Sequence, residues 1–141
     1  MSTKSFTINL PIITGDQDRR RLRKSFSFGC NLQNAVMGGG WDRVLKMRAT
    51  AEWQTARAMP KSSERTKAFR DLRVRFRLSE YDFHADVAKH RKASGRGHLL
   101  GINEGQKLAS RAWISVERHL YNGGAPRFIS SRRGLHSIEG K

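Results

Sequence analysis

The sequence predicts an α+β protein in which a helical bundle is inserted into a small, incomplete β-barrel. Short segments with alternating apolar and polar residues lie near both ends of the chain, and segments of helical periodicity fill the middle. We therefore expect a first β segment over residues 1–14, a helical domain over 15–124 and a second β segment over 125–141.

The first predicted element is a strand over residues 5–13. Phe6, Ile8 and Leu10 alternate there with polar residues, which is the pattern of a strand with one buried face. Pro11 either ends the regular part of this strand or places it at a sheet edge, because proline cannot donate to a ladder.

Five helices are predicted between the two β segments. We expect them over 16–37, over 41–59, from Ser62 or Ser63 to about 78, from the cap Ser79 to the loop at Ser94, and from the cap Asn103 to Gly123. The glycines at 38–40 predict a break between the first two helices, and Pro60 closes the second. The last helix has the clearest apolar row, made of Leu108, Ala112, Val116 and Leu120.

A second strand is predicted over residues 126–130, with Phe128 pointing inward, and a third over 134–140. A barrel built from so few strands leaves exposed sheet edges. We therefore expect association between copies or marginal stability.

Charge is the strongest functional signal. The 141 residues include 28 Lys and Arg against 12 Asp and Glu, a formal net charge of +16. DNA and RNA are the polyanions that such a protein usually meets. A membrane surface is disfavoured, because the basic residues are spread over several segments and no apolar run approaches the roughly 20 residues of a membrane span. The lone Cys30 suits a reducing compartment, and we expect a bacterial or phage-encoded cytoplasmic protein that acts at the nucleoid.

The candidate nucleic-acid contacts are basic side chains and one tryptophan. A run of cations at the start of the first helix opposes the helix dipole, so phosphate binding explains the run better than helix stability does. In the third helix the basic residues recur at helical spacing and form one positive stripe, with a solvated helix face as the alternative. Trp41 is the tryptophan expected to stack on bases, whereas Trp113 is expected in the core. The full set is Arg19, Arg20, Arg21, Arg23, Lys24, Trp41, Arg43, Lys46, Lys67, Arg70, Arg73, Arg77, Arg127, Arg132 and Arg133.

No complete catalytic or metal site is visible in the sequence, and no cofactor is expected. The five histidines lack metal-ligand spacing. Glu80, Asp82 and Asp86 lie close together, but acids at the start of a helix explain them without a metal. A small metal-dependent nuclease that uses Asp82, Asp86 and a histidine is the enzyme alternative.

Three stretches near the C-terminus carry a resemblance to a known family. Residues 100–121, which contain Gln-Lys-Leu-Ala and Val-Glu, are followed by Pro126-Arg127-Phe128 and then by Ser137-Ile138-Glu139-Gly140-Lys141. This pattern resembles the N-terminal half of TnpB-like transposon proteins, the RNA-guided endonucleases related to type V CRISPR effectors.

The resemblance implies a wedge-like β-barrel interrupted by a helical recognition domain. It also implies two ligands, a structured guide RNA and a target DNA with an adjacent short motif. The nuclease domain of the family is absent from these residues, so we expect no cleavage by this chain alone. The alternatives are a truncated or decayed copy, an expressed fragment, and a split subunit whose nuclease domain acts in trans. A stand-alone basic DNA-binding protein or repressor without guide RNA is the alternative.

Overall fold

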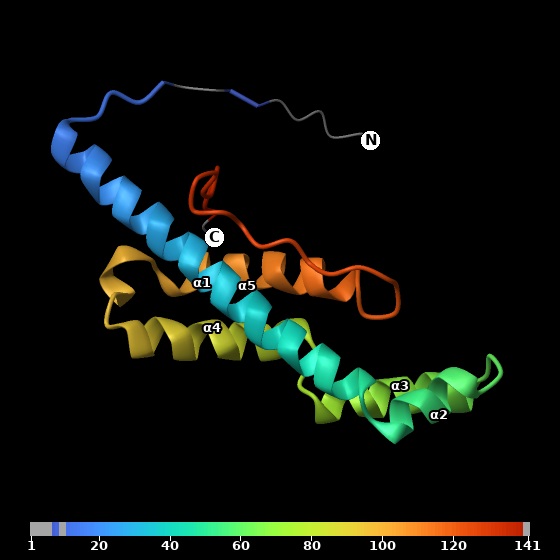
Figure 1. Cartoon of the computed structure of the whole chain (residues 1–141). Coiled ribbons are helices and arrows are strands. Elements are labelled where there is room, and N and C mark those ends of the chain that lie inside the picture. The colour runs from blue at the N-terminus through green and yellow to red at the C-terminus, as the bar shows by residue number, and fades with distance from the viewer. Residues whose placement is uncertain (1–6, 9–10, 140–141) are drawn as a thin grey trace, which may run out of the picture.

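The computed structural model describes residues 7–8 and 11–139, and over these residues the chain is helical (Figure 1). The elements are α1 (Asp16–Arg48), α2 (Ala51–Ala58), α3 (Ser63–Arg75), α4 (Glu80–Ser94), a short 3-10 helix η1 (Gly97–Leu99) and α5 (Ile102–Glu117). α1 is the long axis of the molecule, and α4 and α5 pack along it. α2 and α3 pair with each other at the C-terminal end of α1.

The predicted β-barrel is wrong: the described residues contain no strand. Phe6 and Leu10 of the first predicted strand lie outside the described residues. The segment at 126–130 runs beside α1 instead of a second strand, and Asn34 of α1 pairs with both backbone groups of Ile129. The Asn34 Nδ2 donates to the Ile129 carbonyl at 2.8 Å, and the Ile129 N–H donates to Asn34 Oδ1 at 2.9 Å. A side-chain amide thus replaces the strand partner that the alternation implied.

The predicted break at the three glycines is also wrong, because α1 continues through them to Arg48. Each helical glycine costs about 0.5–1 kcal/mol relative to alanine. Packing explains why this cost is tolerated: Gly40 is buried, and a Cβ there would overlap the fully buried ring of Phe83 on α4. The glycine lets an aromatic ring approach the helix backbone. The predicted helix over 41–59 accordingly divides at Thr50, whose side chain caps α2.

We expect Gly40→Ala to lower the free energy of unfolding by about 1–3 kcal/mol, since the added methyl must displace a buried ring. Gly39→Ala is the matched control, because Gly39 is exposed and the nearest atom to its Cβ would be an arginine nitrogen 3.8 Å away. That control should gain about 0.5–1 kcal/mol from helix propensity. Urea denaturation of the two variants measures both effects. Equal changes in the two variants would show that Phe83 does not need the glycine.

The core lies where α1, α4 and α5 meet. The apolar row predicted for the last helix is confirmed: its four members are fully buried. The bounds of that helix are wrong, because α5 begins at Ile102 after Gly101 and ends at Glu117. The helix caps Ser62 and Ser79 are confirmed, each accepting a hydrogen bond from the backbone N–H three residues ahead.

Arg48 ties the chain after α5 to the end of α1. Its guanidinium donates to the carbonyls of His119, Leu120 and Asn122, the last two at 2.7 and 3.3 Å. These are orphan carbonyls beyond the helix end, and an arginine is well suited to satisfy several of them. The arrangement holds the intervening Tyr121 against the α2–α3 pair.

Candidate nucleic-acid interface

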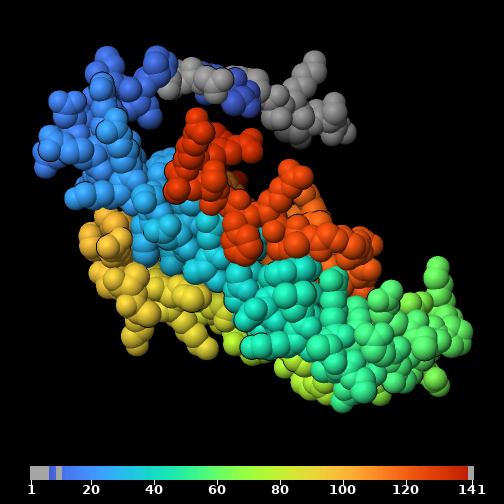
Figure 2. All heavy atoms as spheres, in the orientation of Figure 1, coloured from blue at the N-terminus to red at the C-terminus, as the bar shows by residue number. Residues whose placement is uncertain are grey.

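A groove at the α2–α3 end of the molecule combines aromatic rings with cations. We call it the aromatic-basic groove; its volume is about 690 Å³ and its lining residues are Trp53, Arg57, Lys61, Ser62, Arg65, Thr66, Phe69, Arg70, Arg73 and Tyr121. They come from α2, the following loop, α3 and the segment after α5. Figure 2 shows this end of the molecule in green, projecting beyond the core.

Three rings form the aromatic part of the groove. Tyr121 stacks on Trp53, with ring centroids 5.9 Å apart and an interplanar angle of 13°. Phe69 meets both rings edge-on, at 5.0 Å from Trp53 and 5.4 Å from Tyr121. Trp53 is 3% exposed and Tyr121 is 50% exposed. The buried tryptophan therefore anchors a stack, and the tyrosine presents ring surface to solvent.

The cations around these rings are only partly satisfied by the protein. The Arg65 guanidinium lies over Phe69 at 5.4 Å, and its buried Nε has no hydrogen-bond partner. The pKa of Arg48 is lowered from its usual value by burial and then by repulsion from Arg57, which lines the groove. Arginine stays charged in proteins, so an anion is the natural partner for the guanidinium groups of Arg57 and Arg65 in the groove.

Rings beside guanidinium groups suit one class of ligand in particular. Bases of unpaired nucleotides stack on exposed aromatic rings, and phosphates between them pair with arginines. A duplex hides its base faces and offers its backbone and the base edges in its grooves, on which a ring cannot stack. The geometry of the groove therefore fits single-stranded nucleic acid.

A second groove, which we call the basic groove, lies along the start of α1. Its volume is about 1110 Å³, and it is lined by Gln17, Arg20, Arg21, Arg23, Lys24, Ser27, Arg96, His98 and Leu99. The structure thus brings four of the five cations predicted at the start of this helix together with Arg96, which sequence reasoning missed. Arg19 does not line the groove; its Nε donates to Thr14 Oγ1 at 3.4 Å. The imidazole of His98 is the one aromatic ring in this lining and five of its nine residues are cations, so the groove suits phosphates best.

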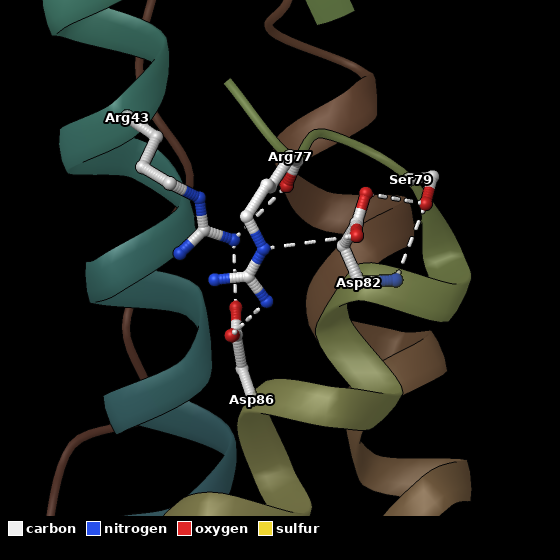
Figure 3. A network of polar contacts seen from close by, with 5 residues as sticks. All are labelled: Arg43, Arg77, Ser79, Asp82 and Asp86. Carbon is white, nitrogen blue, oxygen red and sulfur yellow. Dashed lines mark hydrogen bonds and ion pairs between the residues drawn. The ribbon is translucent and has the colours of Figure 1, made fainter. Parts of the chain in front are cut away.

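Two predicted contact residues lie instead in a network that joins three segments (Figure 3). Asp86, whose side chain is 10% exposed, accepts from Arg43 at 2.7 Å and from Arg77 at 3.0 Å. Arg43 also donates to the backbone carbonyl of Arg77 at 3.2 Å. Arg77 lies beyond α3 in the left-handed region, with φ of 54°, and so leaves the predicted stripe. Both arginines use their guanidinium groups inside the protein.

The other predicted residues are spread over the surface. Trp41 is half-buried, with the Arg48 guanidinium 5.3 Å from its ring, and Lys46 pairs with Asp42 at 3.9 Å. The prediction that Trp113 is a core residue is confirmed. Of the predicted stripe, Arg70 and Arg73 line the aromatic-basic groove, while Lys67 is exposed outside its lining. Arg127, Arg132 and Arg133 are exposed in the irregular segment after α5.

The set of contacts predicted from the sequence contains neither the aromatic trio nor Arg65. Trp53 and Phe69 have the spacing of core residues, and Tyr121 lies beyond the end of α5. Only the fold brings these three segments together. The one local signal is the excess of positive charge at this helix start, where Lys61, Arg65 and Lys67 surround a single acid, Glu64.

Groups that could act chemically hold helices together in this fold. Ser110 of α5 donates to Glu80 at 2.6 Å and lies 2.9 Å from His84 Nε2, both on α4. In a nucleophilic triad the carboxylate would orient the other ring nitrogen of the histidine, whereas here Glu80 is 3.8 Å from the same Nε2. Within residues 7–8 and 11–139, no group of three potential metal ligands is found. Across that same part of the chain, no helix is long and apolar enough to cross a membrane.

No protein-family model matches the chain, and neither a curated protein nor a solved structure does so.

Proposed function

We propose that this protein binds nucleic acid and that the aromatic-basic groove holds unpaired nucleotides of an RNA strand. One observation carries the proposal: the half-exposed Tyr121 stack lies beside Arg65, whose buried Nε has no partner. The net charge of +16 supplies attraction to any polyanion, and the groove adds surfaces that only unpaired bases use.

The basic groove at the start of α1 complements this site. Its cations would contact the phosphates of an adjoining strand or stem without reading bases. A structured RNA, with stems beside unpaired loops, offers both kinds of contact to one protein. This pairing of sites favours structured RNA over uniform duplex DNA.

The narrower form of the proposal rests on the sequence resemblance alone. In this form the chain is TnpB-like, the bound RNA is a guide scaffold, target DNA is a second ligand, and a nuclease acts in trans. A stand-alone DNA-binding protein remains the rival function, motivated by the same basic side chains. Sequencing the nucleic acid that co-purifies after a moderate-salt wash separates the two. One dominant structured RNA supports the guide form, whereas enrichment of one palindromic DNA supports the repressor.

The broader proposal is tested by fluorescence anisotropy with a labelled single strand of about 12 RNA nucleotides and its duplex. We expect tighter binding of the single strand, and a fall in affinity of at least about tenfold between about 50 and 200 mM KCl. Equal affinity for both forms would remove the role of the rings. No binding at the lower salt concentration would end the proposal altogether.

A further inference from the structure

A third pocket lies between the middle of α1 and the irregular C-terminal segment. Its volume is about 450 Å³, and Gln33, Arg127, Phe128, Arg133 and His136 contribute to its lining. It shares no residue with the aromatic-basic groove or with the basic groove. We call it the Gln33 pocket.

The walls of this pocket are built by specific contacts, although they contain no helix or strand beyond α1 and α5. The double hydrogen bond between Asn34 and Ile129 fixes one side. A turn follows, in which the Gly134 N–H donates to the Ser130 carbonyl at 2.9 Å. Arg111 of α5 fixes the other side by donating to the Ser137 carbonyl at 2.8 Å.

Gln33 is the unexplained residue of the pocket. It is 8% exposed, and its buried Oε1 has no hydrogen-bond partner. Buried polar atoms in proteins are almost always satisfied, so an orphan that lines a pocket points to a ligand group. The terminal torsion of glutamine is broad and nearly twofold, so the oxygen or the NH₂ group can face the pocket.

The surroundings define the ligand. Phe128 is 52% exposed and offers a ring for stacking. Arg127 and Arg133 are exposed on the pocket lining, and neither has an ion-pair partner among the described residues. Arg111, in contrast, is paired with Glu139 at 2.8 Å. The acceptor and donor of the Gln33 amide match the edge of a base, and the Phe128 ring matches its face. The two cations match the phosphates of the same nucleotide strand.

We propose that the Gln33 pocket binds one unpaired nucleotide of the RNA and distinguishes its base. The Gln33 amide pairs with the base edge, Phe128 stacks on its face, and Arg127 and Arg133 hold the flanking phosphates. This inference rests on the proposed RNA binding and adds a base-selective position to it. The aromatic-basic groove stacks any base, because every base has a face.

The test compares labelled single strands of about 12 adenines, cytosines or uracils, with wild-type protein and Gln33→Leu. We expect wild type to favour one of the three bases by about five- to tenfold, the effect of a hydrogen-bonded base edge. Gln33→Leu should reduce that preference to less than about twofold. Its melting temperature should not fall, because leucine removes a buried unsatisfied oxygen. The matched control is Gln106→Leu on α5, which lies outside all three pockets and should keep the preference.

Each outcome has one meaning. A preference that survives in folded Gln33→Leu, or no preference in wild type, overturns the pocket while leaving the groove intact. No RNA binding by wild type overturns both proposals. If the leucine variant does not fold, Phe128→Ala replaces it, since this half-exposed ring can be removed with little effect on the core. Loss of the base preference in that variant supports the pocket, and retention of it argues against the pocket.

Discussion

Replacing Asp86 by asparagine is expected to lower the free energy of unfolding by about 3 kcal/mol, the largest effect of any single polar substitution proposed for this protein. Asp86 is the shared acceptor for Arg43 and Arg77 (Figure 3). Its loss leaves Arg43 without a carboxylate partner and leaves Arg77 with Asp82 alone, at 3.8 Å. We place the effect at the lower end of that for buried pairs, because the Arg77 side chain is 43% exposed.

A surface pair gives the matched control. Glu52 on α2 accepts from Arg75 at 3.4 Å, and both side chains are more than half exposed. A backbone hydrogen bond is the main reason that the pKa of Glu52 is lowered, and Arg75 lowers it further by a hydrogen bond and by its charge. Water screens this exposed pair. Glu52→Gln should therefore leave the thermal unfolding midpoint nearly unchanged. If Asp86→Asn melts at the same temperature as Glu52→Gln, the network in Figure 3 does not stabilise the fold.

A second large effect is expected in binding. The double variant Arg65→Gln/Tyr121→Ala should bind a single RNA strand about a hundredfold more weakly than wild type. It should stay folded but melt at a lower temperature, because Tyr121 packs against Trp53 and Phe69. Removing one stacking ring costs about 1–3 kcal/mol, and removing one charged hydrogen bond to phosphate costs about 1.5–3 kcal/mol. We expect their sum to be near 3 kcal/mol, since both groups serve neighbouring nucleotides and do not act independently.

Controls for this experiment exist on α4. Tyr81 is 84% exposed, and Lys89 is exposed in the same helix. Tyr81→Ala/Lys89→Gln removes the same kinds of group, one ring and one positive charge, away from the aromatic-basic groove. It should weaken binding by less than about fivefold, the general effect of lost charge. Equal losses in the two double variants would mean that the protein binds RNA by net charge and not through this groove.

The C-terminal segment should detach from α5 in acid. Arg111 lowers the pKa of Glu139, first by a hydrogen bond and then by its charge. A carboxyl whose pKa is lower in the folded state stabilises that state above its unfolded pKa, and the contribution disappears as pH falls through the folded value. We expect the amide protection of residues 134–139, corrected for the intrinsic exchange rate at each pH, to fall below about pH 4. An Arg111→Gln variant should already exchange quickly at neutral pH. The same rate in both proteins would show that this ion pair does not hold the segment.

Local sequence patterns predicted the caps and buried faces of the helices well, but they did not predict how the elements are arranged in space. Ser62 and Ser79 are correct caps, and the apolar row of α5 is a correct core face, because these features depend on residues within one or two turns. The glycines at 38–40 misled, since the role of Gly40 depends on Phe83, which is far away in sequence.

The β prediction failed for a related reason. Alternation over residues 126–130 indicates an extended segment, but it cannot say whether another strand lies beside it. Here the neighbour is Asn34 on a helix.

The candidate site could be predicted only in part. Arg70 and Arg73 followed from the charge pattern, and both line the aromatic-basic groove. Tyr121 could not be found in this way, since only the Arg48 contacts beyond α5 bring it to Trp53. Arg77 was misplaced because the helix ends before it, at Arg75.

The central claim is that unpaired RNA lies on the rings of the aromatic-basic groove. Ultraviolet cross-linking of the full chain to single-stranded RNA, followed by mass spectrometry of the peptides, tests it most directly. Stacked aromatic residues cross-link, so we predict adducts at Tyr121 and in the α3 peptide that contains Phe69. Adducts confined to the Tyr81 peptide of α4 or to the Arg-rich start of α1, with none at Tyr121, would contradict the claim.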